Sequence, residues 1–156
     1  DGRYWSTETG DVLLVGLDST DLDDAQLDWL DHSLATSDAA WRVVAVHHPP
    51  YSAGYQGSST GVRRALAPIL RRHGVQLVLS GHEHDYQRSK VIDGVTYVVT
   101  GGGSLTRRTG DDDFTAISWS WHHFVDLAVY EDRLVLRAVG GNGRVADEVV
   151  LQPSTR

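Results

Sequence analysis

Two residue types are missing from this sequence of 156 residues, which contains no cysteine and no methionine. Without cysteine, a disulfide framework and any metal or redox site built on thiolates are excluded. Position 1 is an aspartate rather than a methionine. We therefore expect a chain that was processed, or one that belongs to a longer protein.

Positive charge is scarce, because 14 lysines and arginines stand against 21 aspartates and glutamates and the net charge is −7. A protein that neutralises nucleic-acid phosphates needs a basic surface, so this balance argues against a nucleic-acid partner. It argues equally against charge-driven binding to anionic membranes. Long apolar runs are also missing, since none approaches the roughly 18 residues that a membrane span requires. We expect neither a nucleic acid nor a membrane as partner.

Three short apolar runs organise the first half of the chain, at residues 12–17, 42–46 and 75–79. Such runs are typical of strands that are buried on both faces of a sheet. Leucines spaced three and four apart predict a helix that begins at Thr20 or Asp21 and ends near Ser37. A second helix is expected over residues 60–73, where Pro68 should kink or divide it.

The second half of the chain has the pattern of strands only. Asp93-Gly94 is a strong signal for a two-residue hairpin turn. Alternating patterns predict an antiparallel meander over residues 124–130, 133–139 and 144–151. The whole order predicts an α/β (α+β) fold with a mixed sheet and helices on one face. The length makes a single domain over residues 1–156 the expectation.

Histidines follow the ends of two predicted buried strands. His47 comes after the second strand, and His82 and His84 come after the third. Open α/β sheets bind ligands outside the carboxyl ends of their strands, and neutral imidazole is the commonest metal ligand. We therefore predict that His47, His82 and His84 bind metal.

The remaining histidines have simpler interpretations. Single histidines on a surface are usually solvated, which is the interpretation we favour for His32 and His73. His122 and His123 begin a predicted strand, and for His123 we favour a hydrogen-bonded core residue over a ligand.

Two segments together resemble a known family. VVAVHHPPY (residues 43–51) and LVLSGHEHDYQRS (residues 77–89) resemble the last two signature blocks of the calcineurin-like metallophosphoesterases, in their purple-acid-phosphatase-like branch. The similarity extends to GVTYVVTGGGS (residues 94–104) and HHFVDLAV (residues 122–129). It implies the C-terminal half of a metallophosphoesterase αββα sandwich, and hence the C-terminal portion of a catalytic domain.

The resemblance also implies a ligand set. Family members hold two metal ions bridged by a hydroxide and an aspartate. By position, His47 and His82 would bind the second ion and His84 the first. The implied substrate-side residues are His48, Tyr51 and Tyr86. Zinc, iron and manganese all suit histidine and carboxylate ligands, so the resemblance leaves the metal open.

This chain departs from the family pattern in two ways. Tyr55-Gln56 stands in the loop where plant-type acid phosphatases carry a histidine pair. The resemblance also leaves out the family's three preceding blocks, which supply the bridging aspartate, a second aspartate, an asparagine and the histidine that helps to protonate the leaving group. The chain would therefore carry only part of the binuclear site.

Three functions follow from this pattern. The first is a metal-dependent phosphoesterase that hydrolyses phosphate monoesters or diesters by a metal-bound hydroxide, of which this chain is the C-terminal portion. The alternative is a catalytically incomplete half-domain that associates with a missing N-terminal half, with another chain or with itself, because half of a two-sheet sandwich would expose an apolar face. A hydrolase with one metal on three histidines is the third. Many members of this branch are exported, which favours a secreted or extracytoplasmic location.

Overall fold

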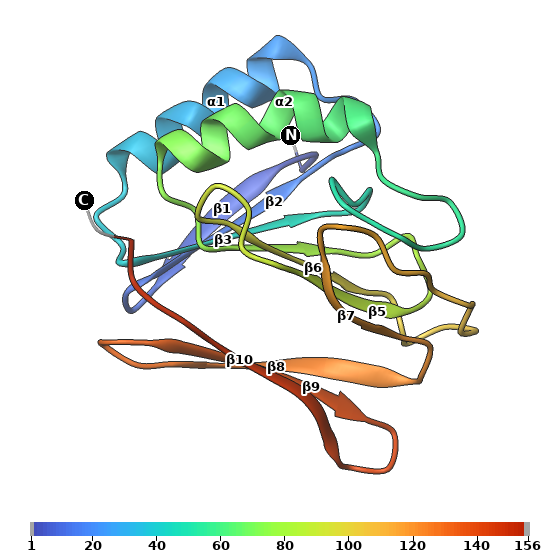
Figure 1. Cartoon of the computed structure of the whole chain (residues 1–156). Helices are drawn as coiled ribbons and strands as arrows, with labels where there is room; N and C mark the ends of the chain where they lie inside the picture. The colour runs from blue at the N-terminus through green and yellow to red at the C-terminus, as the bar shows by residue number, and fades with distance from the viewer. Residues whose placement is uncertain (1, 155–156) are drawn as a thin grey trace.

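The computed structural model describes residues 2–154 and arranges them as a large sheet, a small sheet and two helices (Figure 1). The helices are α1 (Asp24–Thr36) and α2 (Thr60–Arg72). The strands of the large sheet are β1 (Trp5–Thr9), β2 (Val12–Leu17), β3 (Trp41–Val46), β4 (Leu77–Ser80), β5 (Tyr86–Ser89), β6 (Thr96–Thr100) and β7 (Thr115–Trp119). Those of the small sheet are β8 (His123–Val129), β9 (Leu134–Gly140) and β10 (Val145–Leu151).

The large sheet has the strand order β1-β2-β3-β4-β6-β5-β7. Its centre is parallel, because β2, β3, β4 and β6 run in one direction, whereas β1, β5 and β7 pair antiparallel to their neighbours. The central strands correspond to the apolar runs of the sequence. Those strands are covered on both faces, as such runs require. The predicted mixed sheet with helices on one face is confirmed.

Both helices pack on the same face of this sheet (Figure 1). The first begins later than Thr20 or Asp21, because Asp23 caps it by accepting a hydrogen bond from the Gln26 backbone N–H at 2.8 Å. The buried Gln26 side chain binds the backbone of Asp18 and Asp21 and so holds the preceding residues as a loop. In the described part of the chain, no helix is long and apolar enough to cross a membrane.

Pro68 lies inside α2, and of the two expected effects the structure excludes a division of the helix. Proline cannot donate one helical hydrogen bond. The buried Leu66 and Leu70 hold the segment against the sheet on both sides of that position, and such packing supplies most of the stability of a helix in a protein. The helix is followed by Gly74 in the left-handed conformation (φ 61°), which is typical of helix C-termini.

The small sheet covers part of the opposite face of the large sheet (Figure 1). Leu134, Leu136 and Ala138 of β9 form a buried cluster with Trp41 and Leu77 of the large sheet. The expected exposed apolar face is therefore smaller than the sequence suggested, because the C-terminal meander folds back on it. The predicted antiparallel meander is present as β8, β9 and β10.

A buried polar contact joins the two sheets. The Tyr86 hydroxyl donates to Asp147 at 2.7 Å, and the Arg88 guanidinium donates to both oxygens of the same carboxylate at 2.6 and 3.0 Å. Burial acts to raise the pKa of Asp147, but the hydrogen bonds from Arg88 and Tyr86 outweigh it, so the pKa lies below its usual value. The carboxylate is therefore charged at neutral pH and holds strand β5 to strand β10.

Replacing this carboxylate should destabilise the fold. We expect Asp147→Ala to lower the free energy of unfolding by about 3 kcal/mol at pH 7, because Arg88 is left as a partly buried charge without its partner. The control is Glu148→Ala, which breaks an exposed pair with Arg137 and should cost less than about 1 kcal/mol. Urea unfolding of both variants measures the difference.

The same experiment has a pH dependence with a defined sign. Because the folded pKa of Asp147 lies below the unfolded value, its stabilising effect is complete above the unfolded pKa, which is about 3.9, and is lost as the pH falls through the lower folded pKa. The gap between wild type and Asp147→Ala should shrink below about pH 4. A gap that widens in acid would contradict this assignment.

Candidate metal centre

The site is built by the register of two parallel strands. Val46 of β3 pairs with Ser80 of β4, so the residues that follow them leave the sheet side by side. The backbone continues this pairing for one more step, because the Gly81 N–H donates to the His47 carbonyl at 3.2 Å. His47 and His82 are thereby brought together at one edge, although 35 residues separate them in the sequence.

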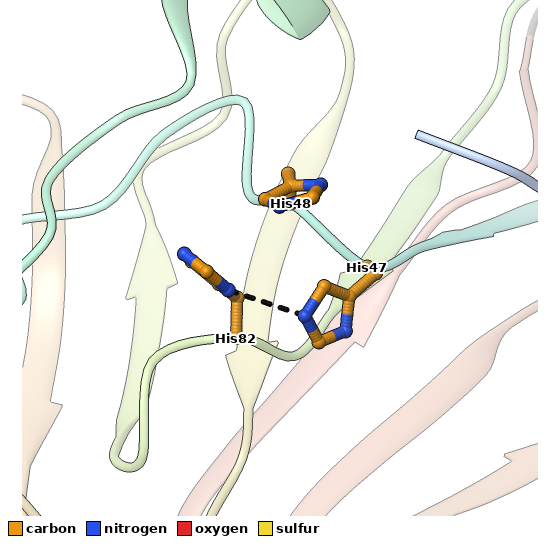
Figure 2. A group of neighbouring side chains, drawn as sticks. All are labelled: His47, His48 and His82. Atoms are coloured by element: carbon orange, nitrogen blue, oxygen red, sulfur yellow. Dashed lines mark hydrogen bonds between the residues drawn. The ribbon is translucent and has the colours of Figure 1, made fainter. Parts of the chain in front are cut away.

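Three imidazole rings meet at this edge (Figure 2). His47 Nε2 and His82 Nδ1 are 3.1 Å apart. The third ring is His48, whose centroid lies 4.9 Å from that of His47 and 4.6 Å from that of His82. One ligand nitrogen from each ring lies within 4.8 Å of the others. We call His47, His48 and His82 the histidine cluster.

The backbone at His82 has a strained conformation. Its φ angle is 68°, which side chains other than glycine rarely adopt, and the Glu83 N–H donates to the Gly81 carbonyl at 2.8 Å. A three-residue turn with this φ at its centre has the features of a classic γ-turn, which is rare. The strain costs about 1–2 kcal/mol. Such strain is typical of functional sites, and here the turn aims the ring at His47.

The cluster suits a metal ion chemically. Burial lowers the pKa of His82, and the neighbouring His48 and His47 lower it further. A neutral imidazole has a free nitrogen lone pair, which is the form that binds zinc and other transition metals. The facing nitrogens of His47 and His82 are ligand atoms that such ions accept. The residues present therefore fit the metal that the sequence predicted.

Ser19 is a residue of this site that the sequence analysis missed. Its hydroxyl lies 2.7 Å from His48 Nδ1 and accepts a hydrogen bond from the His48 backbone N–H at 3.0 Å. It thus fixes the ring and the backbone of one histidine at the same time. The available signal was the position of Ser19 just after the strand Val12–Leu17, at the same sheet edge as the histidines.

His84 lies outside the histidine cluster. Its Nδ1 is 2.9 Å from the Leu105 carbonyl. A carbonyl can only accept, so Nδ1 carries a proton, and in the neutral form of the ring Nε2 has the free lone pair. The Arg107 backbone N–H donates to the His84 carbonyl at 2.9 Å and fixes the same segment. In that form the ring can bind a metal ion through Nε2. The assignment of His84 to a separate ion stays a prediction.

Tyr86 does not face the cluster, which corrects the expectation that it lies by the pocket. Its side chain is fully buried, its ring stacks on Trp119 with centroids 4.6 Å apart, and its hydroxyl is bound to Asp147. The alternation of strand β5 turns this residue toward the small sheet. Burial first, and the Asp147 carboxylate second, raise its pKa far above the usual value, so the hydroxyl keeps its proton.

Tyr51 packs on the helix side of the large sheet. Its ring centroid lies 4.7 Å from that of Tyr97, and the Arg63 guanidinium lies 3.9 Å from the Tyr51 centroid. It is half-buried against the helix-side core. Its role toward a substrate stays a prediction.

The histidines outside the site behave largely as their simpler interpretations predicted. His123 is buried, and both ring nitrogens have partners, the Trp121 carbonyl at 2.9 Å and the Thr100 hydroxyl at 3.1 Å. Burial lowers its pKa. His32 is exposed on α1. His73 is not simply solvated, since its Nε2 lies 2.8 Å from the Asp31 carboxylate and joins the two helices.

Comparison with known proteins identifies the family. A family model described as calcineurin-like phosphoesterase matches residues 2–86, which is more than half of the chain. The chain belongs to the calcineurin-like phosphoesterase family. The match ends just beyond His84, so it includes His47, His82 and His84.

Curated relatives belong to the expected branch. Purple acid phosphatase 3 of Arabidopsis thaliana is 34% identical over 86 residues, which are 54% of this chain and 24% of the relative. Human tartrate-resistant acid phosphatase type 5 is 35% identical over 80 residues, or 51% of this chain and 25% of the relative. The aligned region thus spans about a quarter of the length of these relatives. The resemblance to the purple-acid-phosphatase-like branch is confirmed.

Solved structures share the fold over nearly the whole chain. Purple acid phosphatase PPD1 from yellow lupin (Lupinus luteus) seeds superposes with a TM-score of 0.88 and 20% identity, covering 96% of this chain and 32% of that one. GAP50 of Plasmodium, described as the anchor in the inner membrane complex, gives a TM-score of 0.85 and 18% identity, covering 98% of this chain and 54% of that one. At these identities the likeness establishes the fold.

Metal binding by the cluster can be tested by titration. We expect Zn²⁺ to bind and His82→Ala to weaken the binding at least about tenfold, because one of the facing nitrogens is lost. Isothermal titration calorimetry on both proteins measures the affinity. His32→Ala is the matched control, since it removes an exposed histidine of helix α1 that is not part of the histidine cluster. This variant should bind zinc as the wild type does.

Proposed function

We propose that the chain is the C-terminal portion of the catalytic domain of a metal-dependent phosphoesterase, which hydrolyses phosphate monoesters or diesters. The observation that carries this proposal is the meeting of His47 and His82, 3.1 Å apart, at the carboxyl ends of adjacent parallel strands. The family membership and the acid phosphatases among the relatives support the same reaction class.

The proposed centre holds two metal ions. Zinc, iron and manganese ions all suit histidine ligands. His47 and His82 would hold one ion and His84 the other. A bound ion would supply Lewis acidity, which polarises a phosphoryl oxygen of the ester and stabilises its negative charge. The remaining ligands of such a centre would come from outside these residues.

The chain's own residues have distinct tasks in this proposal. The lowered pKa of His82 keeps its ring neutral and free to bind. Ser19 already accepts from the His48 backbone N–H, so its own hydroxyl proton is available to His48 Nδ1. In that arrangement His48 Nε2 carries the ring proton. His48 is then a hydrogen-bond donor toward a phosphoryl oxygen rather than a third ligand.

The location of the protein is proposed on the family resemblance alone. Members of the purple-acid-phosphatase-like branch are often exported, so we propose a secreted or extracytoplasmic site of action. The acidic net charge of −7 agrees with a small phosphate ester rather than a long polyanion as substrate.

Two substitutions test the reaction. We expect His47→Ala and His82→Ala each to abolish metal-dependent hydrolysis of p-nitrophenyl phosphate by the complete protein, because each removes one of the two facing nitrogens. His73→Ala is the control, since that histidine joins the two helices and should leave hydrolysis nearly unchanged. Full activity in either cluster variant would contradict the proposed function.

A second proposal concerns what covers the open part of the sheet. A groove beside the histidine cluster is lined largely by apolar residues of the large sheet, among them Trp5, Leu17, Ala45, Val46 and Leu79. Trp5 lies against Gly16 there, and 47% of its surface is exposed. This groove reaches His47. We propose that an N-terminal half of the longer polypeptide covers it, which would bring the missing ligands to the site.

The alternative occupant is a second copy of this chain. If the N-terminal half is the natural cover, the isolated chain should self-associate or leave this groove exposed. The longer protein should then not associate through this groove. Multi-angle light scattering on both proteins measures the mass. A well-folded, strictly monomeric isolated chain that binds no apolar dye would contradict the need for a cover.

A further inference from the structure

Glu83 is a buried acidic residue between His82 and His84 in the sequence. Its side chain is 0% exposed, whereas His82 and His84 on either side of it are only partly buried. The turn at His82 therefore directs the imidazoles outward and the carboxylate inward. A buried acidic group needs partners, and those of Glu83 lie in a different part of the chain.

The partners of Glu83 belong to the loop that follows the first histidine segment. Its Oε1 accepts hydrogen bonds from the backbone N–H groups of Gln56 and Gly57, at 2.5 and 3.0 Å. Its Oε2 is buried and has no hydrogen-bond partner within residues 2–154. The two N–H groups are thus the contacts that compensate this carboxylate, and hydrogen bonds to a charged acceptor are among the stronger ones.

Two glycines give Glu83 the space it occupies. A Cβ atom at Gly54 would lie 2.7 Å from the Glu83 carboxyl carbon, and a Cβ at Gly101 would collide with the Glu83 backbone oxygen. Neither glycine has a positive φ angle, so close packing rather than backbone conformation requires the missing side chain. Glu83 is therefore enclosed on both sides.

The same loop is held at its beginning by a second buried group. Gln87 accepts from the Ala53 N–H at 2.7 Å and donates to the Ser52 hydroxyl at 2.9 Å. Its amide also donates to both oxygens of the buried Asp85, at 3.0 and 3.1 Å. Alternate residues of one short segment, Glu83, Asp85 and Gln87, thus form the inner support of the loop.

This loop carries an exposed aromatic ring. Tyr55 is 82% exposed, and the Arg107 guanidinium lies 6.0 Å from its ring centroid. Arg107 is itself fixed to the histidine segment through the His84 carbonyl. The positions of both exposed side chains therefore depend on the segment that carries Glu83.

We infer that Glu83 is a positioning residue that holds the loop of residues 52–58, and with it Tyr55, at a fixed place beside the histidine cluster. In the enzyme, the loop then forms a preset wall of the substrate site, and its loss weakens substrate binding more than the chemical step. That second statement rests on the proposed function. The first concerns this chain alone and has a readout of its own.

Amide hydrogen exchange in the complete protein tests the first statement. We expect Glu83→Ala to speed the exchange of the Gln56 amide about tenfold or more, because that amide loses its acceptor, while amides of β3 and β4 keep their protection. The Gly57 amide should exchange faster by a smaller factor, since it also donates to the Gly54 carbonyl at 3.1 Å. Glu83→Gln retains an oxygen acceptor and should restore most of the protection. Asp147→Ala is the control, since it removes another buried carboxylate and should cause no selective change at Gln56 and Gly57.

A second variant keeps the test usable if Glu83→Ala does not fold. Gly54→Ala places a methyl group against the Glu83 carboxyl carbon and should displace the loop from the other side, with the same two amides affected. Gly61→Ala is its matched control, because a Cβ at Gly61 meets nothing within 4 Å. Unchanged exchange at Gln56 and Gly57 in both Glu83→Ala and Gly54→Ala would overturn the inference.

Steady-state kinetics separate this inference from the proposed function. For p-nitrophenyl phosphate we expect Glu83→Ala to raise KM about fivefold or more and to change kcat by less than about twofold, with Glu83→Gln close to wild type. Equal falls in kcat for Glu83→Ala and Asp147→Ala, with KM unchanged, would overturn the role in substrate binding. A wild-type protein without any hydrolysis would refute the proposed function, while the exchange result would still decide whether Glu83 holds the loop.

Discussion

The in-register parallel pairing of β2, β3 and β4 is the constraint on which the site depends. Leu17 pairs with Val46, and Val46 pairs with Ser80, so three strands end at the same level. The one or two residues after each end leave the sheet at one edge. This is how Ser19, the His47-His48 pair and His82 come together although the sequence separates them. A slip of one residue in any pair would turn the alternating side chains to the other face and would move the histidines away from each other.

The parts of this arrangement that the sequence predicted are those with a strong local signal. Continuous apolar runs identified β2, β3 and β4, because a strand buried on both faces has no other composition. The edge strands β1 and β7 and the short β5 were missed. Strand β1 is exposed along its whole length, and β5 is buried but polar, with Gln87 and Ser89 facing the interior, so neither shows an apolar pattern. These strands form through pairing with neighbouring strands of the sheet, and local residue preferences do not predict such pairing.

The same division applies to the candidate site. His47 and His82 could be placed from their positions after buried strands. The roles of Ser19 and Glu83 could not, because each acts on a residue about 27 to 29 positions away and shows only when the loops are folded. Tyr86 shows the opposite failure, since its motif suggested a pocket residue whereas strand alternation places it between the sheets. A motif fixes which residues are present but not the direction in which each side chain points.

The packing of the small sheet on the large sheet has a consequence for the synthesis of the chain on the ribosome. The last strand of the large sheet ends at Trp119, while the residues that cover Trp41 and Leu77 belong to β9 and β10, which end at Leu151. At typical rates of translation, roughly two to six seconds separate the appearance of these two points. During that interval Trp41 and Leu77 have no cover from the C-terminal meander. The C-terminal meander therefore decides how long the newly made protein is open to association with other apolar surfaces.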